Sequence, residues 1–295
     1  MRLGAFDVIE PIPELLEPHA LAIIRPWIDV GRVGTLTLTR LESQLQAREM
    51  ARFARPGSFF DFTQYRPNIY FREGRRQVTI PNVYVTYARH HPRNDFVFLH
   101  LMEPNCLAEI FVDSILRLIE TCGVRRYHLI GSMYDLIPHT RPLPVSGMAV
   151  GEQAQRELDA QGVRTSDYEG PTTIAYLISQ RAPDMGMDTM TSIVHLPQYT
   201  HLEEDFAGVR RLAQVLSGMY GFAWDPALES KADEQLQEIG AAVDRNPELK
   251  TVLRQLEANY DAQAKGEEVV KGETPQLSPE IEKFLREMGR RFGQN

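Results

Sequence analysis

The chain has 295 residues, of which 43% are hydrophobic and 24% are charged, and its formal net charge is -8 at pH 7. This is the composition of a globular protein that buries one large core or two smaller ones, and its basic residues are too scattered to form a nucleic-acid-binding or membrane-binding surface. No apolar run reaches the roughly 18 to 20 residues that span a bilayer, and the first residues, MRLGAFDVIEPIPELLE, lack the apolar stretch of a signal peptide, so we expect a cytoplasmic protein.

The first hundred residues predict strands joined by turns and one helix. ALAIIRPWID (20–29) has the continuous apolar character of a buried strand, and the later part of TLTLTRLESQLQAREMARF (35–53) has helical character. RRQVTIPNVYVTYARHH (75–91) alternates and is rich in β-branched residues, which predicts a strand or a hairpin with Pro81 near its turn. NDFVFLHLME (94–103) predicts a further buried strand.

A long helix is predicted next, over CLAEIFVDSILRLIETCG, because its apolar residues recur at helical spacing and Gly123 stands where a helix stops. The two cysteines, Cys106 and Cys122, fall at its two ends. At about 1.5 Å per residue they lie roughly 24 Å apart, which is beyond disulfide reach. We therefore expect both thiols to be reduced, as is usual in the cytoplasm.

Strands and helices continue to alternate up to residue 224. RRYHLIGS and DTMTSIVHLP predict strands, VGEQAQRELDAQG predicts a helix closed by Gly162, and EEDFAGVRRLAQVLSGMYG predicts another helix. PTTIAYLISQRAPDMG predicts a helix with Pro171 in its first turn. This alternation predicts an α/β domain over residues 1–224, a three-layer α/β/α arrangement with a mostly parallel sheet.

Residues 225–295 predict a helical C-terminal extension. Strand signals vanish there, and the charged stretch after residue 226 has helical character. KGEEVVKGETPQLSP (265–279) is polar and contains glycine and proline, as linkers do, and EIEKFLREMGRRF predicts a last short helix. These helices form either a solvated appendage or an arm that packs on another subunit or partner.

The stretch LIGSMYDLIPHTRPLPVSG (129–147) places polar residues directly after an apolar strand. Ser132, Asp135 and His139 are near enough in sequence for a nucleophilic-serine site, and in α/β sheets ligands bind at the carboxyl ends of strands. The stretch lacks the second glycine of a G-x-S-x-G turn, so the alternative is that Ser132 or Asp135 satisfies backbone groups of the loop.

Neither a phosphate-binding loop nor a metal site is indicated. DVGRVGTLT lies between a strand and a helix, but it has neither the G-x-G-x-x-G pattern nor the lysine of a P-loop, so a tight turn is the better interpretation. The histidines lack metal-ligand spacing, and we expect no cofactor and no metal. His195 closes an apolar strand and is positioned to face His139 from a neighbouring strand end.

Arg141 is the strongest single candidate for recognition. It stands between Pro138 and Pro142, where the backbone has lost freedom in advance, so its guanidinium is suited to grip a carboxylate or a phosphate. An intramolecular or intersubunit salt bridge would use the same rigidity, and the sequence does not separate these alternatives.

Several motifs, taken in order, resemble the proteasome assembly chaperone family, in its bacterial and archaeal branch related to the second eukaryotic assembly-chaperone subunit. They are LAIIRPWIDVGRVG, FLHLMEPN, the PHTRP loop, the GPT start of a helix and HLPQY, which ends at Tyr199. The resemblance covers roughly residues 15–222. It implies an α/β/α layered fold, homo-oligomers that are trimers among bacterial relatives, and binding of other proteins rather than turnover.

The C-terminus departs from this family. Relatives that dock on the proteasome end in a hydrophobic residue, a tyrosine and one further residue, whereas this chain has Gln294 in place of the tyrosine. This departure argues against insertion of the tail into a proteasome ring. Some bacterial members carry an older description as carboxylate-amine ligases, but this sequence shows neither a phosphate loop nor a magnesium-binding carboxylate cluster.

Two classes of function follow. The first is a cytoplasmic, homo-oligomeric interaction or assembly protein, in which the loops around His139 and His195 line a shared cleft or a subunit contact. The second is an enzyme of the hydrolase, phosphorylase or ligase type that uses Ser132, Asp135, His139, Arg141 and His195. A ligand-binding regulator, with Arg141 gripping an anion, is a third possibility.

Overall fold

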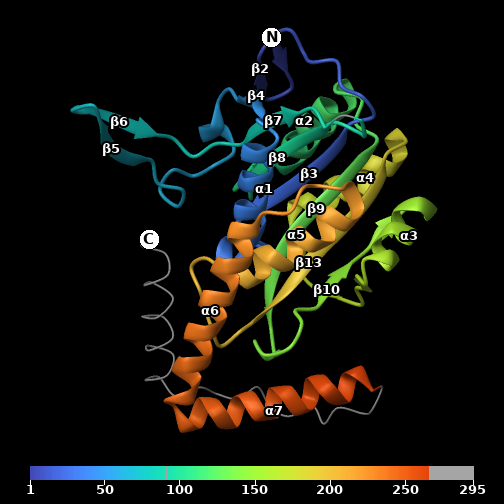
Figure 1. The fold of residues 1–295 in the computed structure, drawn as a ribbon. Helices are drawn as coiled ribbons and strands as arrows, with labels where there is room; N and C mark the ends of the chain where they lie inside the picture. Colours follow the sequence, from blue (N-terminus) through green and yellow to red (C-terminus); the bar gives the residue numbers. More distant parts are fainter. Residues whose placement is uncertain (91, 266–295) are drawn as a thin grey trace.

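The computed structural model describes residues 1–90 and 92–265. Strands and helices alternate as far as α5, and two further helices, α6 and α7, follow (Figure 1). The strands are β1 (Arg2–Leu3), β2 (Phe6–Val8), β3 (His19–Arg25), β4 (Arg48–Phe53), β5 (Asn68–Arg72), β6 (Arg75–Thr79), β7 (Tyr84–Ala88), β8 (Phe96–Met102), β9 (Arg126–Asp135), β10 (Val145–Gly147), β11 (Ala149–Val150), β12 (Arg164–Thr165) and β13 (Asp188–Pro197). The helices are α1 (Val33–Gln44), α2 (Ala108–Thr121), α3 (Glu152–Ala160), α4 (Ile174–Arg181), α5 (Phe206–Tyr220), α6 (Pro226–Asp244) and α7 (Pro247–Ala264), with short 3-10 turns at Val30–Arg32, Pro56–Ser58 and Ala182–Met185.

Eleven strands form one mixed sheet in the order β1-β2-β4-β7-β8-β3-β9-β13-β10-β12, with β11 paired to β13. Its centre is parallel, because β8, β3, β9 and β13 all run the same way. The strands β1, β2, β4 and β7 are antiparallel to their neighbours, and β10 and β11 are antiparallel to β13. The prediction of an α/β fold is confirmed, but the prediction of a mostly parallel sheet is wrong.

A short connection explains why β7 and β8 are antiparallel. Only seven residues separate the end of β7 at Ala88 from the start of β8 at Phe96, and a parallel pair needs a crossover of a dozen residues or more. Strand β4 was predicted as the end of a helix. In the structure α1 stops at Gln44, and Gln46 has a positive φ that turns the chain into β4.

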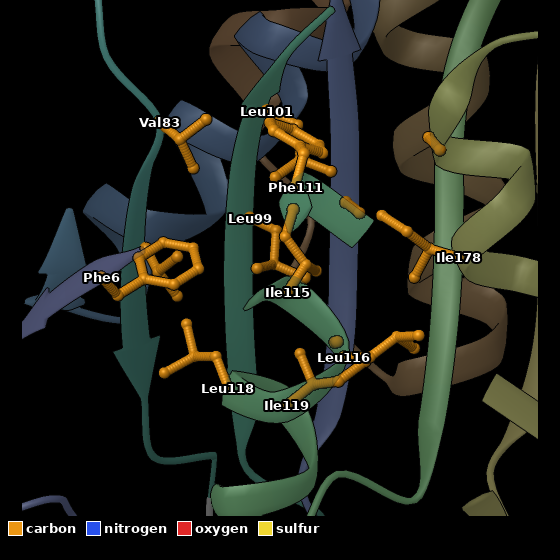
Figure 2. Close-up of a cluster of buried hydrophobic side chains, with 14 of the residues drawn as sticks. Phe6, Val83, Leu99, Leu101, Phe111, Ile115, Leu116, Leu118, Ile119 and Ile178 are labelled. Carbon is orange, nitrogen blue, oxygen red and sulfur yellow. The ribbon is translucent and has the colours of Figure 1, made fainter. Parts of the chain in front are cut away.

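Helices cover both faces of the sheet and produce two large hydrophobic clusters. On one face α2 and α4 pack over β8 and β9, and Figure 2 shows Phe111 and Ile115 of α2 directed at Leu99 and Leu101 of β8. On the other face α1, α3 and α5 pack against the same sheet around Val194 and Leu212. The continuous apolar runs of the central strands follow from this double coverage, because both faces are buried.

Helix α4 begins later than its proline suggests. Pro171 precedes the helix instead of lying in its first turn, and Thr173 is the extended residue before Ile174. The Thr173 side chain makes no capping bond. Instead, the Ile174 N–H donates to Oε1 of Glu103 (3.0 Å), so a carboxylate from the end of β8 satisfies a helix N-terminus that lies 71 residues away in sequence.

Other sequence signals are confirmed. Gly123, Gly162 and Gly221 follow α2, α3 and α5 with positive φ, the conformation that glycine adopts at least cost. The two cysteines flank α2 and are both free. Among residues 1–90 and 92–265, no helix has both the length and the apolar character needed to cross a bilayer.

The C-terminal helices attach to the α/β body. Helix α6 begins at Pro226, close to the predicted boundary after residue 224, and its Leu228 joins the second hydrophobic cluster. Gln235 of α6 is buried and bonds to Phe206 N–H and to the Glu204 carbonyl. Leu249 and Leu256 of α7 form a third cluster with residues of the loop after β13. The predicted linker after residue 265 and the predicted last helix lie outside the described residues.

The aromatic cluster under α2 yields a stability prediction. Phe111 is fully buried, and its ring centroid lies 5.5 to 6.5 Å from those of Phe53, Phe59 and Phe60. Phe111→Ala is expected to lower the free energy of unfolding in urea by about 3 to 5 kcal/mol. The control is Ile110→Ala, since Ile110 precedes Phe111 on α2 and is 51% exposed, and its cost should stay within about 0.5 kcal/mol. Equal costs would contradict the assigned core face of α2.

Candidate functional site

Ser132 is fully buried and its hydroxyl is already used. It donates to the Val30 carbonyl (2.6 Å), and the Ser132 N–H donates to the Ile28 carbonyl (2.9 Å). Strand β9 therefore passes directly against the loop that leaves β3. Gly131 permits this contact, because a Cβ there would lie 2.2 Å from the Ile28 oxygen. Ser132 holds two backbone segments together and is not placed as a nucleophile.

Asp135 and His195 do meet, and a second serine completes the group. Nδ1 of His195 lies 2.7 Å from Asp135 Oδ2, and Nε2 lies 2.8 Å from Oγ of Ser146. Asp135 ends β9, His195 lies near the end of β13, and Ser146 lies on β10, which pairs with β13. The register of these strands brings the three side chains to one face of the sheet. The hydrogen bond from His195 lowers the pKa of Asp135, so this carboxylate is ionised and accepts the Nδ1 proton. In that tautomer Nε2 accepts a hydrogen bond from Ser146, which is the order of a Ser-His-Asp arrangement.

His139 bonds to Tyr199 rather than to His195. The Tyr199 hydroxyl accepts the His139 N–H (2.8 Å) and also lies at hydrogen-bond distance from Nδ1 of the same residue. Burial lowers the pKa of His139 and raises that of Tyr199, so both side chains are neutral and the hydroxyl donates to Nδ1. The pair joins the PHTRP loop to the loop after β13, the two loops that the sequence placed around one cleft.

Arg141 binds the C-terminal helix α7. Its Nε and one terminal nitrogen donate to the two carboxylate oxygens of Asp261 (2.9 and 2.8 Å), and its other terminal nitrogen donates to Glu257 (3.2 Å). These hydrogen bonds raise the pKa of Arg141 and lower that of Asp261. Thr140 donates to Glu257 (2.6 Å), and Tyr260 donates to the Pro142 carbonyl (2.8 Å). The rigid loop thus holds α7 by intramolecular hydrogen bonds and ion pairs, an arrangement hereafter called the latch. Of the two alternatives for Arg141, the structure shows the intramolecular salt bridge rather than the binding of an external anion.

A pocket of about 550 Å³ lies between this loop, α5 and α6, and it is lined by three arginines. Arg141 is bound to α7, Arg210 donates to Glu229 and Asp233, and Arg211 donates to the Leu143 carbonyl. Each arginine therefore already has an acceptor within the chain. A ligand anion in this pocket would have to compete with these contacts.

At the start of α1, a carboxylate of the protein itself binds the helix N-terminus. The buried carboxylate of Asp29 accepts the Thr35 N–H (3.0 Å) and the Thr35 hydroxyl, so a side chain of the protein occupies the position where an anion would bind. Throughout residues 1–90 and 92–265, no three histidine, cysteine or carboxylate side chains are grouped so as to hold a metal ion.

Sequence reasoning missed Ser146 and the α7 carboxylates. Ser146 lies within the stretch that was singled out, but its strand has only three residues, too few for an alternation pattern to show. Glu257 and Asp261 are spaced i,i+4, which places them on one face of α7 and is a readable signal for a cationic partner. Nothing in the sequence indicates that this partner is Arg141.

The latch can be tested by limited proteolysis. Arg141→Ala removes the guanidinium from Asp261 and Glu257, so α7 should be cleaved several-fold faster, while the α/β body resists as before. Arg254→Ala is the matched control, because Arg254 is an exposed arginine of the same helix and no ion pair of it appears in the described part of the chain. Unchanged cleavage of α7 in Arg141→Ala would contradict the latch.

The buried histidines make stability depend on pH. Burial lowers the pKa of His139, and burial with the nearby Arg126 charge lowers the pKa of His19 to about 4 and of His128 to about 3. In the unfolded chain these histidines titrate near pH 6.5, so below that pH their side chains bind more protons in the unfolded chain than in the folded one. The stability that these histidines contribute is then complete above about pH 6.5 and is lost on acidification, by up to about 1.4 kcal/mol per pH unit for each histidine, whereas the raised pKa of buried Asp205 acts in the opposite direction.

Urea unfolding at pH 7, 6 and 5 checks this dependence. His139→Gln should unfold more easily at pH 7, because its bond to Tyr199 changes, but it should lose less stability between pH 7 and 5 than the parent chain. If His139→Gln lost as much stability between pH 7 and 5 as the parent chain, His139 would not be held neutral in the folded state.

Comparison with known proteins identifies the relatives of this fold. A protein of unknown function from Corynebacterium glutamicum superposes with a TM-score of 0.77 at 19% identity, covering 88% of this chain and 98% of its own. A proteasome-assembly chaperone homologue from Mycobacterium tuberculosis has a TM-score of 0.70 at 24% identity, covering 79% and 99%. An archaeal proteasome activator from Pyrococcus furiosus has a TM-score of 0.63 at 16% identity, covering 81% and 98%.

These structures share the fold of the chain across almost their whole length. No curated protein sequence matches it. The family model described as the PAC2 family matches residues 23–245, which include the parallel strands β8, β9 and β13, the PHTRP loop with Arg141, and the Asp135, Ser146 and His195 group. The chain belongs to the PAC2 family.

Proposed function

We propose that this protein is a cytoplasmic, homo-oligomeric interaction protein with an assembly-chaperone-like role. The observation that supports this most directly is the hairpin of β5 and β6, which projects from the body of the molecule (Figure 1). All ten residues of its strands are exposed, among them Ile69 at 63% and Phe71 at 69%. Monomeric proteins seldom leave such apolar surface uncovered, so it favours a protein partner.

The relatives support the same class of function. The Mycobacterium tuberculosis relative is described as a proteasome-assembly chaperone homologue and the Pyrococcus furiosus relative as a proteasome activator, so both descriptions refer to the proteasome. The resemblance of the sequence to this family favours an oligomer of three copies of the chain.

The oligomer is tested by size-exclusion chromatography with light scattering. At micromolar concentration the mass should be about three times the 33.7-kDa mass of the chain. Affinity purification from the native cell should recover one protein in constant ratio to the chain, and this recovery should be lost when the exposed hairpin residue Phe71 is changed to serine. A monomer that recovers no partner would contradict the proposal.

A second candidate function, acyl transfer at Ser146, is favoured by the Asp135–His195–Ser146 group. Ser146 lines a pocket of about 460 Å³ with mostly apolar and aromatic walls, which suits an ester of an apolar acid. Ser146 Oγ would attack the carbonyl carbon and pass its proton to His195 Nε2 as the ester C–O bond breaks, and the leaving alkoxide would take that proton. Water would then hydrolyse the acyl-serine with His195 as base, which regenerates Ser146.

Labelling with a fluorophosphonate, followed by peptide mass spectrometry, tests this candidate. Ser146 should be modified, and His195→Ala should slow its modification by at least about 100-fold because the general base is lost. Ser132→Ala should leave labelling of Ser146 intact, since Ser132 is buried behind Val30. An unmodified Ser146 in the parent chain would exclude the activated serine.

A further inference from the structure

A wide cleft of about 1010 Å³ opens at the carboxyl ends of two central parallel strands. Arg25 ends β3 and Met102 ends β8, and both residues line the cleft. Residues at the start of β7 and at the base of the β5–β6 hairpin line it as well. Ligands of α/β sheets lie outside the carboxyl ends of the strands, and this volume is at the upper end of the range for small-molecule sites. The cleft is therefore a candidate ligand site by its position and its size.

Arg25 supplies this cleft with a cation that has no acceptor. Its side chain makes no hydrogen bond and no ion pair with any residue among 1–90 and 92–265, and its Nε is buried. The backbone is held in place, because the Arg25 carbonyl accepts the Glu103 N–H (2.9 Å) from the end of β8. The three arginines of the pocket beside α5 differ, since each donates to an acceptor of the chain. A guanidinium that is partly withdrawn from water gains more from an anion than an exposed one does.

Carboxylates in the region of Arg25 are bonded to other groups. The charge of Arg25 acts on Asp29, but this carboxylate accepts the N–H and the hydroxyl of Thr35. Glu103 accepts the Ile174 N–H (3.0 Å) at the start of α4. Neither carboxylate forms an ion pair with Arg25, so within the described chain the guanidinium remains available to an anion in the cleft.

The unpaired charge of the cleft is positive. The two acids that line it, Asp7 and Glu49, each form an ion pair with an arginine (2.8 and 2.6 Å). Arg66 also lines the cleft and forms no ion pair with a described residue. The stretch 48–79, which supplies much of the lining, contains seven arginines and three acids, although the whole chain has a net charge of -8. This local excess of cations favours a negatively charged ligand.

The walls beside Arg25 are aromatic and apolar. The Tyr84 ring stacks on His100, with centroids 4.2 Å apart, and Tyr65 donates its hydroxyl to the Glu103 carbonyl (2.9 Å), so both rings are fixed. The Tyr84 hydroxyl makes no hydrogen bond with a described residue, and burial raises its pKa, so it stays protonated and can donate. The hairpin and β8 add aliphatic side chains to the same lining. The ligand that fits these walls carries an apolar part beside its anionic group.

We infer that this cleft binds a small organic carboxylate with an aromatic or aliphatic body. The Arg25 guanidinium donates to the carboxylate, the Tyr84 hydroxyl donates to one of its oxygens, and the body lies along the apolar walls. A phosphate fits less well, because phosphates favour helix N-termini and the N-terminus of α1 is bound by Asp29. The cleft is separate from the pocket beside Ser146, and its ligand does not depend on the function proposed above.

Saturation-transfer NMR on the full chain tests this site with 3-phenylpropionate as the probe. The acid should bind at millimolar concentration, whereas neutral 3-phenylpropionamide should not, because it lacks the charge. Acetate should bind more weakly than 3-phenylpropionate, because it lacks the body that contacts the apolar walls. Phenyl phosphate should also bind more weakly. Tighter binding of phenyl phosphate than of 3-phenylpropionate would overturn the carboxylate as the ligand.

Variants assign the binding to this cleft. Arg25→Gln should raise the dissociation constant of 3-phenylpropionate at least about tenfold, and Tyr84→Phe should raise it about three- to tenfold. The control is Arg89→Gln, at an exposed arginine outside the cleft, which should leave the constant unchanged.

Three outcomes would overturn the site. They are the absence of binding by the acid, equal binding of acid and amide, and parent affinity in both Arg25→Gln and Tyr84→Phe. Unchanged far-UV circular dichroism confirms that a variant folds. If Arg25→Gln does not fold, Tyr84→Phe and the comparison of acid with amide on the parent chain decide the result.

Discussion

Gly131 lies where strand β9 passes the loop that leaves β3, and the two backbones touch there. The Ser132 N–H and hydroxyl bond to two successive parts of that loop, at Ile28 and Val30, and no side chain larger than hydrogen fits at Gly131. Because this contact holds β9 against the neighbouring loop, the strand continues to Asp135 beside β13. Asp135 ends the same strand and the PHTRP loop follows it, so this contact helps to position both. A substitution at Gly131 would displace the PHTRP loop and the strand end together.

The PHTRP loop connects other parts of the same chain to one another and is not an open binding site. His139 is bound to Tyr199, Arg141 to Asp261 and Glu257, and Pro142 to Tyr260 through its carbonyl. The prolines restrict the loop in advance, so less conformational entropy is lost when it holds α7. Surfaces that stay open to other molecules include the β5–β6 hairpin and the pocket of about 460 Å³ beside Ser146, and neither contains a residue of the PHTRP motif (138–142).

Periodicity in the sequence was sufficient for the central strands, for α2, α3 and α5 and for the glycine stops, because these depend on neighbours within a few residues. It failed for the direction of the outer strands, since neighbours such as β2 and β4, or β4 and β7, are separated by long stretches of chain. It also failed for α4, whose first N–H is capped by Glu103 from another strand. The Asp135–His195–Ser146 group and the Arg141 latch join positions 49 to 120 residues apart. A single sequence indicates which residue types are suited to interact, but only the three-dimensional structure shows which of them are in contact.

His128 has a role beyond its titration. Its two ring nitrogens lie 2.9 Å from the Tyr220 hydroxyl on α5 and 2.9 Å from the Ser192 hydroxyl on β13. If β13 slipped by one residue along β9, Ser192 would turn to the opposite face and leave a buried imidazole nitrogen without a partner. These hydrogen bonds, together with the one between Asp135 and His195, therefore favour the observed alignment of β13 with β9.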